Sequence, residues 1–217
     1  MLATYTFNSQ YQPTNLNEVR LPALRLLEGG KFHADQFAPV LIKEYEQLRL
    51  KFFRWGLIPA WSKPSRPTKG RPYAAADHLF NHTVYQIPVR RQRCLIPADG
   101  YYVEAASIPS KQTFKLARPD EATFCFAGIY DSSRQKDGST LHTFSIVTTP
   151  SNGEMTRFGL QMPLVLPKKY EALWLNPNAN LRRISDLLYT SANHELSIHP
   201  VRELQLHEME RFEQVAA

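Results

Sequence analysis

The chain has 217 residues, of which 43% are hydrophobic and 21% charged, so it is long enough to bury a core and has the composition of a soluble globular protein. No window approaches the roughly 18 consecutive apolar residues of a membrane span, and the start MLATYTFNSQ lacks the basic and apolar regions of a secretory signal. The formal net charge is +6 and the pI is about 9.3.

The positive charge is concentrated in one segment. Between Arg49 and Arg93 the sequence has ten Lys or Arg residues and one acid, Asp77, so this segment alone carries a net charge of +9 and the rest of the chain is acidic. Such asymmetry is typical of a surface that binds phosphate groups, and it also fits a basic patch that serves only solubility.

The first predicted element is a helix over residues 21–30, which ends at glycine. Strands are predicted where β-branched and aromatic residues run together between Asp, Gly, Ser and Pro. The predicted strands cover residues 48–52, 93–100, 113–117, 123–131, 142–149 and 161–166. Two more helices are predicted, over 167–176 after a proline and over 178–189 with asparagine caps.

This order of elements predicts an α+β fold, with a mainly antiparallel sheet that curls toward a barrel and has flanking helices. The stretch at 62–72 is rich in Pro, Ser and Lys but short, and apolar segments flank it. We therefore interpret it as a surface loop and expect a single domain over residues 1–217.

The cysteines and histidines form no convincing metal site. Cys94 and Cys125 are isolated, which predicts two half-buried thiols in a reducing cytoplasm. In HELSIH (194–199) the second histidine comes one residue too late for the H-E-x-x-H zinc motif. His78 and His82 are four residues apart but have no third ligand that the sequence identifies. We predict no metal, no cofactor and no membrane contact.

Several motifs together resemble the SRAP family, also called SOS response-associated peptidases or abasic-site processing proteins. The opening MLATYTF is similar to the family's start, Met-Cys-Gly-Arg-Tyr-Thr and an apolar residue, and the resemblance extends over nearly the whole chain. The motifs occur in the family's order: RWGLIPAWSK (54–63), RRQRCLIPADGYY (90–102), FAGIYD (126–131), FSIVTTPSNGEM (144–155) and MPLVL (162–166).

The resemblance implies one α+β domain with a positive cleft for single-stranded DNA and a role in DNA damage. In the family, a cysteine at position two attacks the ring-opened aldehyde of an abasic site through its α-amine and thiolate, leaving a DNA–protein crosslink. A glutamate and a histidine assist proton transfers, and an asparagine holds the sugar. The aldehyde needs an amine for the Schiff base, a thiol to close the ring and acid–base groups to move protons.

All four of these positions differ in the present sequence. Glu104 lies one residue beyond the family's glutamate, and in a strand over 101–104 its carboxylate would point to the opposite face. The possible remnants of a reactive site are the Met1 amine, Glu104 and His78, so the resemblance predicts a pseudoenzyme. The positions that match the family's Cys, Asn, Glu and His are Leu2, Ala74, Val103 and Gly159.

The basic segment contains the predicted DNA-binding surface. In the family this region lines the DNA cleft, and Trp61 matches a position that stacks near the bases; a structural lid is the alternative role for Trp61. An aromatic ring among cations has the composition of a single-strand platform. Trp55 is expected in the core, and Arg90, Arg91 and Arg93 are candidates to extend the patch. The predicted DNA-binding residues are Arg54, Trp61, Lys63, Arg66, Lys69 and Arg71.

Three functions remain open at this point. The first is non-covalent binding of single-stranded or abasic DNA by a degenerate relative of the family, located in the cytoplasm. The second is an active crosslinker or lyase that uses the Met1 amine with Glu104 or His78. The third is a protein-interaction module without DNA, a reading favoured by Thr4 and Ala76, which replace family arginines.

The bulky Leu2 side chain should hinder removal of the initiator methionine, so we predict that the purified protein retains Met1. Intact mass spectrometry tests this, and the expected mass is that of the full 217-residue sequence. A mass lower by one methionine residue would contradict the prediction and would expose the Leu2 amine instead.

Overall fold

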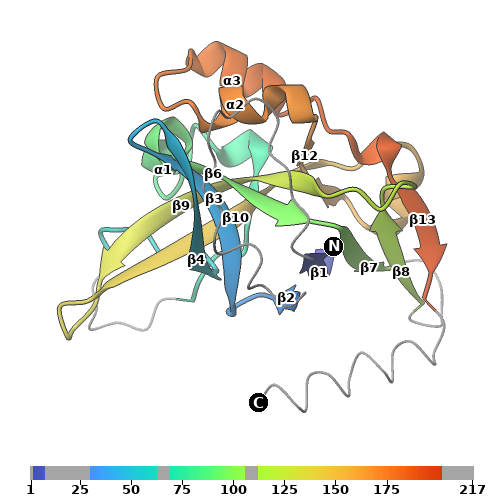
Figure 1. The fold of residues 1–217 in the computed structure, drawn as a ribbon, viewed down its shortest axis with the longest axis horizontal. Coiled ribbons are helices and arrows are strands. Elements are labelled where there is room, and N and C mark those ends of the chain that lie inside the picture. Colours follow the sequence, from blue (N-terminus) through green and yellow to red (C-terminus); the bar gives the residue numbers. More distant parts are fainter. Residues whose placement is uncertain (1, 8–29, 63–68, 106–111, 202–217) are drawn as a thin grey trace.

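A closed ring of five strands forms the centre of the fold (Figure 1). The computed structural model describes residues 2–7, 30–62, 69–105 and 112–201. Every pair in the ring is antiparallel except β10–β4, which is parallel and closes it. In order around the ring, the strands are β4 (Gln47–Trp55), β3 (Phe37–Glu44), β6 (Arg93–Ala98), β9 (Phe124–Arg134) and β10 (Thr140–Pro150). The predicted α+β fold with a curled sheet is confirmed.

Three short strands extend this ring. β5 (Tyr73–Ala75) runs parallel to β10, β11 (Gln161–Pro163) is antiparallel to β10, and β12 (Val165–Leu166) is antiparallel to β9. The predicted strand over 161–166 is therefore two strands. They separate at Leu164, whose N–H donates to the Val147 carbonyl at 2.9 Å while its own carbonyl accepts from the Ala127 N–H at 2.9 Å. Leu164 thus connects β10 to β9.

A second, antiparallel sheet packs against the ring and contains the N-terminal strand. Tyr5 in β1 joins the two sheets, because its ring centroid lies 5.5 Å from that of Trp55 and 5.9 Å from that of Phe126. The strands of this sheet, in spatial order, are β13 (Ser197–Pro200), β8 (Thr113–Ala117), β7 (Gly100–Glu104), β1 (Leu2–Phe7) and β2 (Gly30–His33).

The helices are short and gather at one end of the ring (Figure 1). Asn180 caps α3 as predicted, since its side chain accepts from the Arg182 N–H at 2.9 Å. The predicted helix over 21–30 lies outside the described residues except for Gly30, which begins β2. The helices are α1 (Gln86–Arg91), α2 (Glu171–Leu175) and α3 (Leu181–Leu187), with 3₁₀ turns η2 (Ala76–His78), η3 (Gly153–Phe158), η4 (Lys168–Tyr170) and η5 (Asn193–Glu195).

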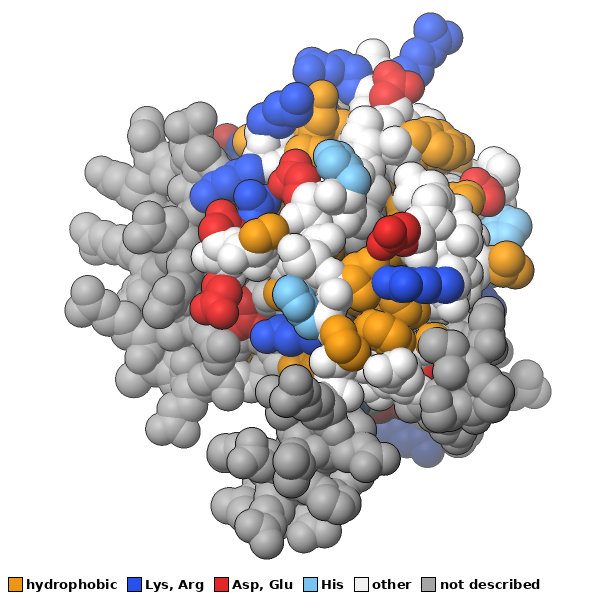
Figure 2. All heavy atoms as spheres, turned by 90° about the vertical axis from the view of Figure 1, so that its right-hand side faces the viewer, with side chains coloured by type: hydrophobic (Ala, Val, Ile, Leu, Met, Phe, Trp, Pro, Cys, Tyr) orange, Lys and Arg blue, Asp and Glu red, His pale blue; other side chains and the backbone are white. Residues whose placement is uncertain are grey.

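None of the helices in the described part of the chain has the length and apolar character that crossing a membrane requires. The face of the molecule that lies on the right of Figure 1, around β8 and β13, has both signs of charge interspersed around a group of apolar side chains (Figure 2). The single domain over residues 1–217 stays a prediction.

Arg93 is a buried cation that connects two helices to the ring, which corrects the suggestion that it extends a surface patch. Only 4% of the residue is exposed. Its guanidinium donates to the carbonyls of Val89 at 2.6 Å and Arg90 at 2.9 Å at the end of α1, and to those of Trp174 at 2.6 Å and Asn176 at the end of α2. Burial lowers the pKa of Arg93 to about 10, so the group remains charged at neutral pH.

Replacing Arg93 by methionine should destabilise the protein by about 2–4 kcal/mol, because buried carbonyl groups at the ends of two helices would lose their donor. Urea denaturation measures the free energy of unfolding. The matched control is Arg91→Met, an exposed site, for which we expect a change within about 0.5 kcal/mol. An unchanged urea midpoint for Arg93→Met would show that the guanidinium bonds contribute no net stability.

Candidate functional site

The positions that match the family's cysteine and glutamate lie side by side in the second sheet. Leu2 in β1 pairs with Val103 in β7, and the register shifts between Leu2 and Thr4 through a β-bulge. Val103 in turn pairs with Phe114 in β8. Bulges are frequent beside active sites, where they redirect the chain. The end of β1 is therefore placed next to the residue that replaces the family's glutamate.

Gly159, at the position of the family's histidine, is connected to the same region through aromatic contacts. The ring of Phe158 lies 5.2 Å from that of Phe114, centroid to centroid, and the Arg157 guanidinium lies over both rings, at 4.8 Å and 5.5 Å. Gly159 has a φ of 134°, a conformation that side chains with a Cβ atom rarely adopt. A histidine at this position would need a different backbone.

Ala74, at the position of the family's asparagine, reaches this region through β10. Ala74 pairs with Val147, and Thr148 pairs with Ala75 on one side and with Pro163 in β11 on the other. β11 begins two residues after Gly159. Leu2 and Val103 are thus direct neighbours in the second sheet, whereas Ala74 belongs to the ring and Gly159 lies between η3 and β11.

The groups at these positions supply no proton-transfer chemistry. Ala74 is completely buried, and Val103 is 2% exposed. Glu104 is exposed and follows Val103 in the strand, so its carboxylate lies on the opposite face of β7. His78 is exposed at the end of η2. The structure does not bring Glu104 or His78 to the buried face where Val103 lies.

Several buried polar atoms near this region have no hydrogen-bond partner among the described residues. They include the Tyr5 hydroxyl in β1, and burial raises the pKa of that hydroxyl well above its ordinary value. The others are Thr149 Oγ1 and Ser151 Oγ at the end of β10, and Gln161 Oε1 in β11. The sequence gives no signal for Thr149 or Ser151, because TTPSN simply predicts a strand that ends in a loop.

Neither cysteine replaces the missing thiol. Cys94 in β6 and Cys125 in β9 are both fully buried in the ring, which corrects the expectation of half-buried thiols. Burial raises the pKa of the Cys94 thiol far above neutrality, which keeps it protonated and unreactive. Within the described ranges, no three His, Cys, Asp or Glu side chains are grouped to hold a metal ion.

All the predicted DNA-binding residues except Arg54 belong to one segment whose two ends are joined; we call residues 56–71 the basic loop. Leu57 and Arg71 exchange two backbone hydrogen bonds of 2.9 and 3.0 Å. The indole N–H of Trp55 donates to the Pro72 carbonyl at 2.9 Å. Trp55 is completely buried, which confirms its expected place in the core.

The basic loop presents its aromatic ring and cations to solvent. Trp61 is 66% exposed, and Lys69 and Arg71 are also exposed. Arg54, at the end of β4, is half-buried. Lys63 and Arg66 lie outside the described residues. Arg90 and Arg91, at the end of α1, are exposed as well.

The family model described as SOS response associated peptidase (SRAP) matches residues 28–204 of the chain. The chain belongs to the SRAP family. The abasic site processing protein YoqW of Bacillus subtilis strain 168 is 31% identical over 160 residues, which are 70% of this chain and 71% of that protein. The abasic site processing protein HMCES of Gallus gallus is 25% identical over 174 residues, 68% of this chain and 51% of that protein.

Solved structures of other proteins share the fold of this chain. A crystal structure of a protein from Bacteroides thetaiotaomicron has a TM-score of 0.69 and 26% identity, covering 80% of this chain and 78% of that one. A phage-related protein from Bordetella bronchiseptica shares the fold, with a TM-score of 0.70 and 22% identity over 93% of this chain and 94% of that chain. The expected SRAP-type fold is thereby confirmed.

The base of the basic loop depends on glycine in this SRAP protein. A Cβ atom on Gly70 would lie 2.5 Å from the Gly56 carbonyl oxygen, which is backbone and cannot move aside easily. Replacing Gly70 by alanine should therefore lower the free energy of unfolding by about 1–3 kcal/mol, as measured by urea denaturation. The neighbouring variant Lys69→Ala, at an exposed position, should stay within about 0.5 kcal/mol. Equal stability of the two variants would mean that the Gly56 backbone leaves room for a methyl group on residue 70.

Proposed function

We propose that this protein binds single-stranded or abasic DNA without forming a covalent crosslink. The observation that carries the proposal is the pairing of Leu2 with Val103, because a hydrocarbon side chain stands at each of the two positions that would need a thiol and a carboxylate. The relatives named abasic site processing proteins support DNA with abasic sites as the ligand.

Loss of the crosslinking chemistry follows from the reactive groups that are missing. Ring closure on an aldehyde needs a thiol beside an amine, and Leu2 provides none. Proton transfer needs an acid or base within hydrogen-bond reach of the reacting atoms. Glu104 projects from the other face of β7, and Gly159 has no side chain.

Non-covalent DNA binding is supported by the exposed side chains of the basic loop. An exposed indole offers a face for stacking, worth about 1–3 kcal/mol per base. Lys69 and Arg71 are exposed on the return arm of the loop. Their charges would contact phosphates and make the affinity salt-dependent. The cytoplasmic location remains part of this proposal.

The test incubates the protein with a single strand that carries one abasic site. We expect no band on a denaturing gel that resists heating, with or without borohydride trapping. On native gels we expect retention whose affinity falls about twenty- to fiftyfold when salt rises fourfold, as three or four phosphate contacts on a single strand require. A covalent band would overturn the loss of chemistry. No retention at low salt would overturn DNA binding and favour a protein-interaction module.

Two aromatic variants separate stacking from general surface effects. Trp61→Ala should raise the Kd for the single strand roughly five- to 150-fold, through the loss of about 1–3 kcal/mol of stacking. The control is Tyr45→Ala in the β3–β4 turn, where the residue is 93% exposed and lies at the opposite end of β4 from the basic loop. The Kd of this variant should not change. Equal effects of the two variants would contradict a specific role for Trp61.

A further inference from the structure

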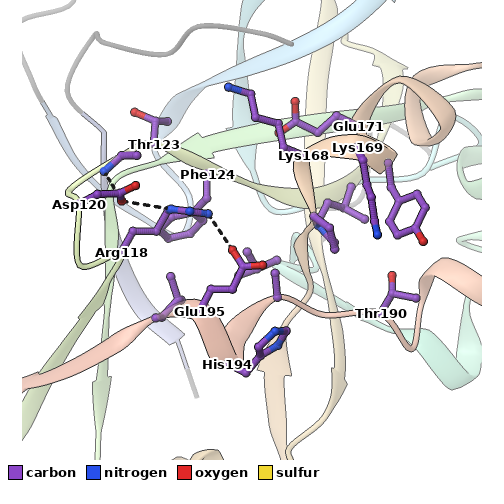
Figure 3. Close-up of a pocket in the computed structure, with 17 residues that line it drawn as sticks. Arg118, Asp120, Thr123, Phe124, Lys168, Lys169, Glu171, Thr190, His194 and Glu195 are labelled. Carbon is purple, nitrogen blue, oxygen red and sulfur yellow. Dashed lines mark hydrogen bonds and ion pairs between the residues drawn. The ribbon is translucent and has the colours of Figure 1, made fainter. Parts of the chain in front are cut away.

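The described part of the chain contains a cavity of about 760 Å³ that the DNA-binding proposal does not use. It lies between the turn after β8, the start of β9, the connection from β12 to α2, and η5 (Figure 3). None of its lining residues belongs to the basic loop or to the four substituted family positions. Its volume is within the range of roughly 300–1,000 Å³ that small-molecule pockets occupy.

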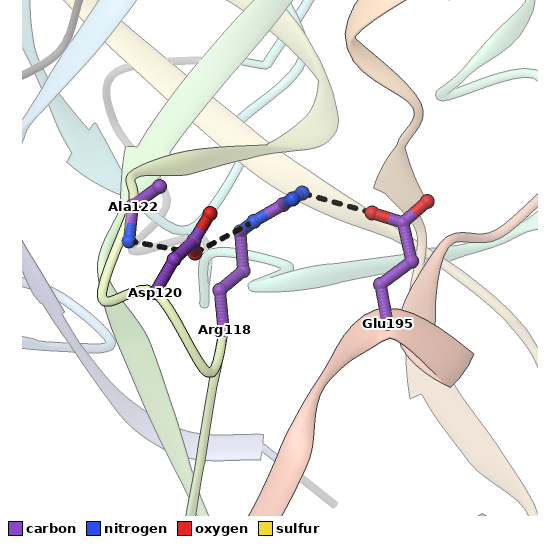
Figure 4. A network of polar contacts seen from close by, with 4 residues as sticks. All are labelled: Arg118, Asp120, Ala122 and Glu195. Carbon is purple, nitrogen blue, oxygen red and sulfur yellow. Dashed lines mark hydrogen bonds and ion pairs between the residues drawn. The ribbon is translucent and has the colours of Figure 1, made fainter.

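One wall of the cavity is acidic and is held in place by an arginine (Figure 4). The Arg118 guanidinium bonds to Asp120 Oδ1 at 3.2 Å and to Glu195 Oε2 at 2.8 Å, and Asp120 Oδ1 also accepts from the Ala122 N–H at 3.1 Å. The Ala122 amide, together with Arg118, holds the pKa of Asp120 below its usual value, so it is ionised.

This wall has carboxylate oxygens that are available to accept hydrogen bonds from a ligand. Two carboxylates face one guanidinium, so the group of three carries a net negative charge. Asp120 Oδ2 and Glu195 Oε1 make no hydrogen bond within the described residues. An ionised carboxylate oxygen in this position is an acceptor for hydroxyl or amine donors of a ligand.

The other wall has a net positive charge, because two lysines line it with one acid, the buried Glu171 (Figure 3). Lys168 and Lys169, in the η4 turn, are both exposed and line the cavity. Neither ammonium group forms an ion pair with the part of the chain that the structure describes; Lys169 Nζ instead lies 5.0 Å from the centroid of the Tyr170 ring. In Figure 3, Lys169 lies across the cavity from Arg118 and Asp120. The side chains of Lys168 and Lys169 extend in different directions in Figure 3, and both are long enough to turn toward a ligand. Their combined charge exceeds that of Glu171, so this wall favours a phosphate.

The floor between these walls is apolar. Phe124, Val165, Leu166 and Leu196 line it and are buried. A ligand matched to the cavity therefore has an anionic group at one end, hydrogen-bond donors at the other and an apolar surface between them. A phosphate, the hydroxyl groups of a sugar and a flat base combine these features in one molecule.

We propose that this cavity binds a nucleoside monophosphate, with its phosphate on Lys168 and Lys169 and its sugar hydroxyls on Glu195 and Asp120. The same chemical unit occurs as a free nucleotide and at the 5′ end of a nucleic-acid strand. Both sources present one phosphate next to a sugar, so the experiment includes both.

The test is calorimetric titration of the full chain with adenosine 5′-monophosphate, with adenosine and inorganic phosphate as separate arms. We expect the monophosphate to bind at least about tenfold more tightly than either fragment, since each fragment meets only one wall. Equal binding of inorganic phosphate alone would overturn the proposal, and so would the absence of any binding.

Variants locate the binding. Lys168→Ala combined with Lys169→Ala should weaken monophosphate binding about tenfold or more, whereas the control pair Arg134→Ala with Lys136→Ala, at exposed positions around the β9–β10 turn, should leave it unchanged. Ala122→Trp, an exposed rim position, should block the cavity while the melting temperature stays the same. Binding that survives both cavity variants lies elsewhere and contradicts the assignment.

Two further readouts separate the sources and the two proposals. Displacement of the bound monophosphate by a short strand with a 5′ phosphate, but not by the same strand with a 5′ hydroxyl, assigns the cavity to strand ends. Failure of both strands to displace it assigns the cavity to the free nucleotide. Retention of abasic DNA on native gels should be unchanged in the double-lysine variant, so this proposal and DNA binding by the basic loop can fail independently.

Discussion

The contact between Tyr5 and the aromatic residues of the ring fixes where the N-terminal strand lies. Tyr5 is fully buried, with its ring centroid 5.2 Å from Phe32, 5.5 Å from Trp55 and 5.9 Å from Phe126. Aromatic pairs at these separations contribute about 0.5–1.5 kcal/mol each beyond the area they bury. The pairs with Trp55 and Phe126 hold β1 against the ring three residues from Leu2, and the pair with Phe32 joins β1 to β2. The position of the second residue is therefore set by core packing and is independent of the chemistry that its side chain can perform.

Because of this separation, the framework does not depend on which residue occupies position two. The basic loop is attached to the same aromatic core through Trp55 and the Pro72 carbonyl, so it is presented to solvent whatever residue occupies position two. Ala74 and Val103 are buried, and their side chains have no polar atoms that need hydrogen-bond partners, so they are compatible with a stable core. The side chains of Thr149, Ser151 and Gln161 have buried polar atoms without hydrogen-bond partners in the described residues, so this part of the fold contains polar groups that the core packing does not use.

The sequence predicts elements well where the pattern is local. The strand over 113–117 agrees at both ends with β8, and the strands over 123–131 and 142–149 are extended only by a few residues in β9 and β10. β5 has only three residues and is defined by its pairing with β10, so no local sequence pattern predicts it. Arg93 shows the same limit for side chains. Its sequence neighbours are basic, and only the distant carbonyls of Trp174 and Asn176 make it a core residue.

The parallel pairing of β10 with β4 has a consequence for the way the protein acquires its fold. Thr143 and Phe144 pair with Arg54 and Trp55, so the two strands meet across a long stretch of sequence. Contacts of this separation are slow to form because a large loop must close first. On the ribosome, β3 and β4 would emerge as a hairpin in which the other edge of β4 has no partner until β10 is made. Until β10 is synthesised, that edge can pair with other chains, so this protein should be most prone to aggregation while it is still incomplete.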